Sequence, residues 1–127
     1  MATRYVEVSS QAIENLLSSK GFVRTVQNRE VVYVFTHKAD PCVKVKVYTS
    51  LRDGASVARG CGEDAIRICT VFEGNGKSFG IGKFPKILRT GSEEAVLDRI
   101  IERARIAYLR GTEFVKESRA RFANRAS

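Results

Sequence analysis

The chain has 127 residues, and its 22 basic and 14 acidic side chains leave a formal net charge of +8 with a pI near 9.8. This length suits a single domain with one hydrophobic core. No stretch approaches the roughly 20 apolar residues of a membrane helix, and residues 1–10 lack the apolar run of a signal peptide, so we expect a soluble, cytoplasmic protein that is not bound to a membrane.

The basic excess narrows the class of partner. Residues 1–91 hold 14 basic and 8 acidic side chains, whereas residues 92–127 hold 8 and 6, so most of the excess lies in the first part. Positive charge favours polyanions such as nucleic acid, although it also simply keeps a small protein in solution.

The first elements in the chain are a short strand and a helix. Residues 5–8 alternate as a strand does, and residues 11–20 carry an apolar stripe at helical spacing. Ser9 or Ser10 is suited to cap this helix, and Gly21 suits the left-handed residue that follows a helix.

Three strands joined by short turns follow. Residues 22–26 and 31–36 are rich in β-branched and aromatic residues and flank a polar turn at 27–30. A second turn at 37–41, which contains a proline, leads into a strand at 43–48. Turns this short join antiparallel strands, because parallel neighbours need a longer crossover.

The strand at residues 43–48 shows the clearest pattern in the chain. Its apolar residues are Val43, Val45 and Val47, and they alternate with Lys44, Lys46 and Tyr48. Successive strand residues point to opposite sides of a sheet. We therefore expect one dry face packed against helices and one outward face that carries cations and an aromatic ring.

A long loop separates this strand from the next hairpin. Residues 50–64 are rich in glycine and polar residues, and loops of this length are often functional. Residues 65–72 predict a fourth strand and residues 78–84 a fifth. The turn at 73–77 between them contains Asn-Gly, a strong hairpin signal.

The last predicted element is the longest helix. It starts at Thr90 or Ser92, with Glu93 placed as in a capping box, and we expect Gly111 to end it. Residues 112–127 then form a basic extension. The chain divides into a domain at 1–111 and an extension at 112–127.

The predicted fold class is α+β. The order β-α-β-β-β-β-β-α gives a single antiparallel sheet of about five strands, with the N-terminal helix and the long C-terminal helix packed on one face. The other face of the sheet remains free for function.

The leading functional hypothesis is non-enzymatic binding of nucleic acid. Single-strand binders use cations that follow the phosphates and aromatic rings on which bases stack. We expect single-stranded DNA or RNA to be bound with little sequence specificity. The candidate binding residues are Lys44, Lys46, Tyr48, Arg52, Arg59, Arg67, Lys77, Arg119 and Arg121.

Two alternatives use the same residues. The lysines of the outward face can merely be solvated and guard the sheet against aggregation. The basic surface can also belong to a protein-interaction module, an inhibitor or adaptor that engages an acidic protein. Self-association as a homo-oligomer fits either function, because the sheet edge and the 112–127 extension both offer surfaces.

Enzymatic and cofactor chemistry finds little support. Cys61 lies among glycines and carboxylates, but His37 is the only histidine available to activate it. The segment at 76–78 ends like a phosphate-binding loop but lacks the required earlier glycine. The odd set of three cysteines shows neither disulfide nor zinc spacing. We expect reduced thiols, no metal and no cofactor.

Overall fold

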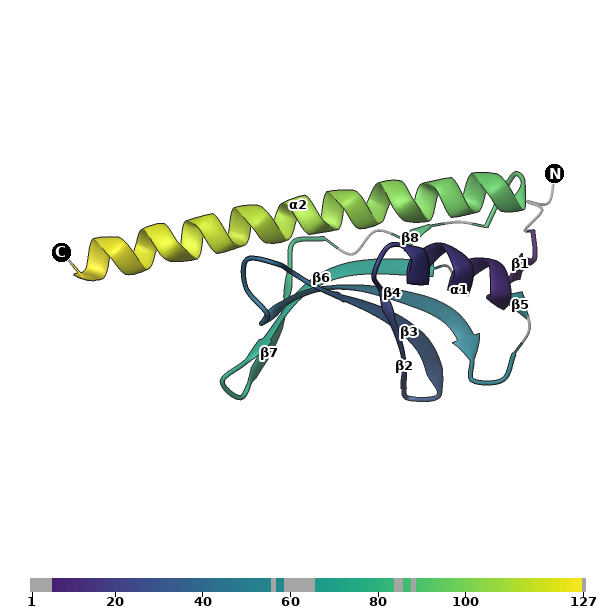
Figure 1. The fold of residues 1–127 in the computed structure, drawn as a ribbon, viewed down its shortest axis with the longest axis horizontal. Helices are drawn as coiled ribbons and strands as arrows, with labels where there is room; N and C mark the ends of the chain where they lie inside the picture. The colour runs from purple at the N-terminus through teal and green to yellow at the C-terminus, as the bar shows by residue number, and fades with distance from the viewer. Residues whose placement is uncertain (1–5, 56, 59–65, 84–85, 88, 127) are drawn as a thin grey trace.

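A computed structural model describes residues 6–55, 57–58, 66–83, 86–87 and 89–126. It is an α+β fold in which both helices lie on one side of an antiparallel sheet (Figure 1), as the sequence predicted. The elements are β1 Val8–Ser9, α1 Ser10–Ser19, β2 Val23–Gln27, β3 Glu30–Thr36, β4 Val43–Arg52, β5 Val57–Ala58, β6 Ile66–Gly74, β7 Lys77–Ile81, β8 Lys86–Ile87 and α2 Glu93–Ala126. Within the described ranges, no helix is both long and apolar enough to cross a membrane.

The main sheet has the strand order β2-β3-β4-β6-β7, and every neighbouring pair is antiparallel. The short strand β8, which the sequence did not reveal, pairs with the first residues of β6 on the edge opposite β4. The first described strand is Val8–Ser9, which does not include residues 6–7 of the strand predicted at 5–8, and it pairs with β5 outside the main sheet. The sheet arches beneath α2, and its two hairpins, β2-β3 and β6-β7, curve away from the helix (Figure 1).

Both hairpins turn on two residues in the left-handed region. The β2-β3 turn has Asn28 at φ 51° and Arg29 at φ 67°, and the β6-β7 turn has Asn75 at φ 52° and Gly76 at φ 73°. Two successive positive φ angles match the right-handed twist of the flanking strands. The Asn-Gly signal therefore predicted its hairpin for the correct physical reason.

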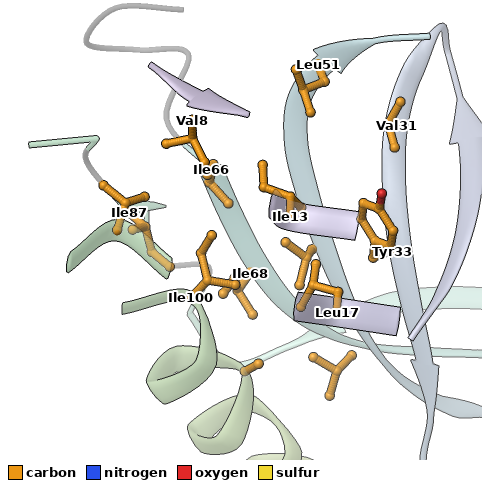
Figure 2. Packing of buried hydrophobic residues seen from close by; sticks show 14 of the residues in the cluster. Val8, Ile13, Leu17, Val31, Tyr33, Leu51, Ile66, Ile68, Ile87 and Ile100 are labelled. Carbon is orange, nitrogen blue, oxygen red and sulfur yellow. The ribbon is translucent and has the colours of Figure 1, made fainter. Parts of the chain in front are cut away.

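The alternation in β4 places its valines in the core. Val43, Val45 and Val47 are at most 1% exposed. Helix α1 lays Ile13 and Leu17 against this side of the sheet (Figure 2). Burial of each large aliphatic side chain contributes about 1.5–3 kcal/mol, so this layer supplies most of the driving force for folding.

Serine caps both helices, as the sequence allowed, but the predicted capping box of Thr90 and Glu93 is wrong, because the Glu93 carboxylate accepts from the Ser9 N–H at 3.3 Å. The Ser9 hydroxyl accepts hydrogen bonds from the Gln11 and Ala12 N–H groups at 3.2 and 3.4 Å. Gly21 follows α1 with φ 91°, as a left-handed closing residue should. Ser92 caps α2, because its hydroxyl accepts from the Ala95 N–H at 3.1 Å.

The predicted end of the second helix at Gly111 is wrong. Helix α2 continues through this residue to Ala126. Gly111 is buried, and a Cβ atom there would lie 3.0 Å from Val43 Cγ1 and 3.2 Å from His37 Cδ2. The glycine is therefore required for close approach of the helix to the sheet, not for a left-handed helix end.

The predicted 50–64 loop is partly ordered into strands. Strand β4 extends to Arg52, and β5 lies within the loop. The β3-β4 register shifts between Glu30 and Val32, so that four residue steps along β4 are matched by two along β3. This bulge lies beside the candidate site described next. Residues 56 and 59–64 of the loop lie outside the described residues.

Candidate nucleic-acid interface

The face of the sheet turned away from the helices carries the predicted cations. Alternation along β4 places Lys44, Lys46 and Tyr48 there, and Arg67 of β6 lies directly opposite Tyr48. This face is less open than the sequence suggested. Lys46 is only 5% exposed, because its neighbours cover it.

Lys44 and Lys46 both point to one carboxylate. Their ammonium groups lie 3.5 and 3.0 Å from the two oxygens of Glu73 on β6. Partial burial raises the pKa of Glu73, but the hydrogen bond and charge of Lys46, together with Lys44, outweigh it, and the pKa is lowered overall. The carboxylate therefore stays ionised and neutralises one of the two lysines.

Arg67 is held between a carboxylate and a ring. One guanidinium nitrogen donates to both oxygens of Glu30 at 3.0 Å. The guanidinium carbon also lies 4.9 Å from the centroid of the Tyr48 ring. Partial burial raises the pKa of Tyr48, so the phenol is neutral at physiological pH. The pair forms a flat cationic and aromatic stack.

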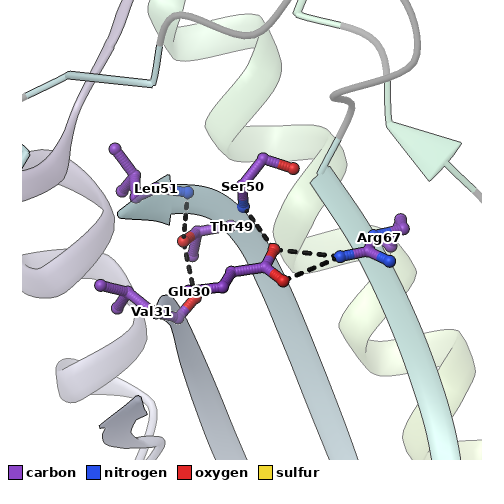
Figure 3. A network of polar contacts seen from close by, with 6 residues as sticks. All are labelled: Glu30, Val31, Thr49, Ser50, Leu51 and Arg67. Atoms are coloured by element: carbon purple, nitrogen blue, oxygen red, sulfur yellow. Dashed lines mark hydrogen bonds and ion pairs between the residues drawn. The ribbon is translucent and has the colours of Figure 1, made fainter. Parts of the chain in front are cut away.

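The bulge in β4 positions Glu30, which holds the Arg67 side chain of this stack (Figure 3). Ser50, at φ 59°, turns its N–H to Glu30 at 2.8 Å. The buried Thr49 hydroxyl donates to the Val31 carbonyl at 2.7 Å and accepts from the Leu51 N–H at 3.1 Å. The extra residues thus keep their polar groups bonded while they bring Arg52 opposite Glu30, the first residue of β3.

Three arginines converge on a polar pocket at this end of the sheet. The pocket has a volume of about 340 Å³. Its lining residues are Asn28, Arg29, Glu30, Ser50, Leu51, Arg52 and Arg67. Arg29 and Arg52 are exposed, and neither forms a side-chain ion pair within the part of the chain that the structure describes. With one carboxylate among three guanidinium groups, the pocket suits an anion with several oxygens, such as a phosphate.

The nine predicted residues do not form one surface. Arg52 and Arg67 line the arginine pocket, and the Tyr48 ring contacts Arg67, whereas Lys44 and Lys46 lie farther along β4 with Glu73. The other described candidates lie elsewhere. Lys77 is the first residue of β7, Arg119 donates to the Ala39 carbonyl at 3.0 Å, and Arg121 pairs with Glu117 at 3.5 Å.

The length of β4 accounts for the distance between Arg119 and the arginine pocket. The residues from Val43 to Arg52 span about 30 Å at 3.3 Å per residue. Arg119 contacts the turn that precedes Val43, so it lies at the opposite end from the arginine pocket. Arg59 lies outside the described residues.

Sequence reasoning missed three residues of this surface. Arg29 was assigned only to a polar turn, and Glu30 and Glu73 were not recognised as partners of the cations. The sequence could have predicted Arg29 at a hairpin tip, since 27–30 was already predicted as a turn. The two carboxylates had no local signal, because their partners lie 27 and 37 residues away in the chain.

The described residues contain no group of three or more His, Cys, Asp or Glu side chains placed to hold a metal ion. Burial raises the pKa of the Cys69 thiol, which keeps it protonated. His37 bonds through its two ring nitrogens to the Ala39 N–H and the Thr112 hydroxyl. Cys61, whose activation by His37 the sequence disfavoured, lies outside the described residues.

Comparison of the chain with protein-family models, with curated proteins and with solved structures finds no match.

Proposed function

We propose that this protein binds nucleic acid without catalysing a reaction, and that it favours single strands with little sequence specificity. The observation that carries the proposal is the convergence of Arg29, Arg52 and Arg67 on one pocket beside an aromatic ring. Phosphates and bases need these two kinds of group, and here the Tyr48 ring adjoins Arg67, one of the arginines of the pocket.

The arginines supply the phosphate contact. Guanidinium groups bind phosphate oxygens through paired N–H donors, and Arg29 and Arg52 are free of ion pairs in the described part of the chain. Glu30 offsets one of the three charges, which leaves an excess of two within the pocket. The strand is then held mainly by backbone charge, which carries no sequence information.

The Tyr48 and Arg67 stack supplies the base contact. Unpaired bases stack on aromatic rings and on guanidinium planes, with about 1–3 kcal/mol per base. A base in a duplex is already stacked and cannot use such a platform without leaving its neighbours. The platform is therefore the reason to favour a single strand over a duplex.

The lysines have a smaller part in this proposal than in the hypothesis from sequence. Glu73 neutralises one of Lys44 and Lys46, so this part of the face carries a net charge of only about +1. We expect these lysines to extend the path of the strand rather than to anchor it.

The test is fluorescence anisotropy of a labelled single-stranded oligonucleotide at low and at several-fold higher salt. Each phosphate contact on a single strand contributes about 0.7 to the slope of log affinity against log salt. The double variant Arg29→Gln/Arg52→Gln should therefore bind more weakly and lower the slope by about 1.4. The matched control is Arg103→Gln/Lys116→Gln, which removes two exposed cations from α2 instead.

Two results would contradict the proposal. One is the absence of binding at low salt, after which an acidic protein partner becomes the function to test by pull-down. The other is an equal loss of affinity in both double variants, which would mean that net charge alone drives binding. Competition with a duplex of the same sequence tests the preference for single strands.

A further inference from the structure

A second pocket lies on the helix side of the sheet, between the end of α1, strands β3 and β4 and the middle of α2. Its volume is about 230 Å³. Six side chains supply its apolar lining: Phe22, Val45, Phe35, Ile101, Ala104 and Tyr108. It opens on the opposite side of the sheet from the arginine pocket, so it is independent of the proposed nucleic-acid site.

The aromatic side chains of this lining pack against one another. The Phe35 ring lies between two others, 5.3 Å from the Phe22 ring and 5.7 Å from the Tyr108 ring, measured between centroids. The second of these contacts is edge-to-face. His37, the residue after β3, stacks on Tyr108 with 4.1 Å between the ring centroids. Another aromatic ring can extend this arrangement with similar geometry.

Two cations border the apolar lining. Lys20 follows α1, Arg105 lies on α2, and both are exposed residues that line the pocket. Long basic side chains pack their stems on apolar surface and keep the charge in water, so the charged ends lie toward the opening. Neither forms an ion pair within the described part of the chain, and none of the described lining residues is acidic.

We propose that this pocket binds a small aromatic carboxylate, with its ring between Phe35, Ile101 and Tyr108 and its carboxylate between Lys20 and Arg105. Apolar pockets with a few placed polar groups are the usual form of small-molecule sites. A dry cavity of about 150 Å³ accepts benzene, so this larger pocket has room for a two-ring body. The two cations select an anion over a neutral or cationic ligand of the same shape.

Isothermal titration calorimetry with 2-naphthoate and with the neutral 2-naphthalenemethanol tests the proposal. The full chain should bind the carboxylate more tightly than the alcohol. The double variant Lys20→Gln/Arg105→Gln should bind the carboxylate about tenfold more weakly and leave the alcohol unchanged, because a charged hydrogen bond is lost only with the first ligand. Arg103→Gln, a neighbouring exposed arginine that does not line the pocket, is the matched control.

A variant that fills the pocket tests whether the ligands bind there or at another surface. Ala104→Leu fills the lining and should remove binding of both ligands. If this variant does not fold, chemical-shift changes in the intact chain serve instead, and they should gather on the methyl groups of Val45, Ile101 and Ala104. The proposal is overturned if 2-naphthoate fails to bind, if the charge variant binds it as the control does, or if the shifts lie elsewhere.

Discussion

The guanidinium of Arg67 lies over the Tyr48 ring, 4.9 Å from its centroid, while one of its nitrogens donates to both oxygens of Glu30. This group is therefore already engaged on two sides before any ligand arrives. Glu30 orients the guanidinium, but it also competes with an incoming phosphate for the same nitrogen. The strength of binding at this site depends on that competition.

Removal of the competing charge should strengthen binding. We expect Glu30→Gln to raise the affinity for a single-stranded oligonucleotide by a few fold in the anisotropy assay. The cost should be about 0.5–1 kcal/mol of unfolding free energy, since the Arg67 pair is partly exposed. Glu117→Gln makes the same change in net charge at the distant pair with Arg121. An equal gain in both variants would show that Glu30 does not compete locally.

His37 should make the folded protein less stable as the solution becomes mildly acidic. Burial lowers the pKa of His37 below its ordinary value of 6.5, against the weaker opposing effects of the Tyr108 backbone and Asp40. The unfolded chain therefore binds a proton at higher pH than the folded chain does. Stability is full above about pH 6.5 and falls as the pH drops from there toward the folded pKa.

Urea unfolding between pH 8 and pH 5.5 measures this loss, and NMR titration follows the single histidine directly. The lowered carboxyl pKa values of Glu14 and Glu73 act only at lower pH, so they do not interfere. His37→Gln should flatten the dependence within this window. A measured pKa of His37 at or above 6.5 in the folded protein would contradict the expectation.

Loss of Glu73 should lower the stability of the folded protein more than loss of Lys46 does. Glu73→Gln leaves an ammonium group that is 5% exposed without its counter-charge, and we expect a loss of about 1–3 kcal/mol. Lys46→Met keeps the volume and removes the charge, so it should change stability by less than about 1 kcal/mol. Urea unfolding of both variants provides the comparison, and the reverse order would be inconsistent with a buried lysine.

Replacement of Gly111 by a residue with a larger side chain should destabilise the protein, although Gly111 lies within a helix. In an exposed helix, replacement of glycine is stabilising by about 0.5–1 kcal/mol. Gly111→Leu should instead destabilise the protein by about 1–3 kcal/mol, because even a Cβ atom lies 3.0 Å from Val43 and 3.2 Å from His37. Ala120→Leu, at an exposed position of the same helix, is the control and should change stability little. Thermal or urea unfolding that shows no difference between them would remove the close-approach argument.

Local signals account for the correct parts of the sequence prediction. The alternation of Val43, Val45 and Val47 predicted the buried face of the sheet, and the Asn-Gly pair predicted a hairpin. The serines before the two helices predicted their caps. Each of these signals lies within a few residues of the structure that it specifies. The same logic failed at Gly111, where a residue typical of helix ends serves a contact with a distant strand.

The sequence by itself determined the class of fold, because strand alternation, turn residues and helix caps depend only on residues that are close together in the chain. Only the tertiary structure decided which charges are free. Glu73 reaches Lys46 across 27 residues of chain, and Glu30 reaches Arg67 across 37, through the register of β3, β4 and β6. That register depends on packing and on the bulge at Ser50, not on any local pattern. It leaves Arg29 and Arg52 available beside Tyr48 and Arg67 while it neutralises part of the lysine row.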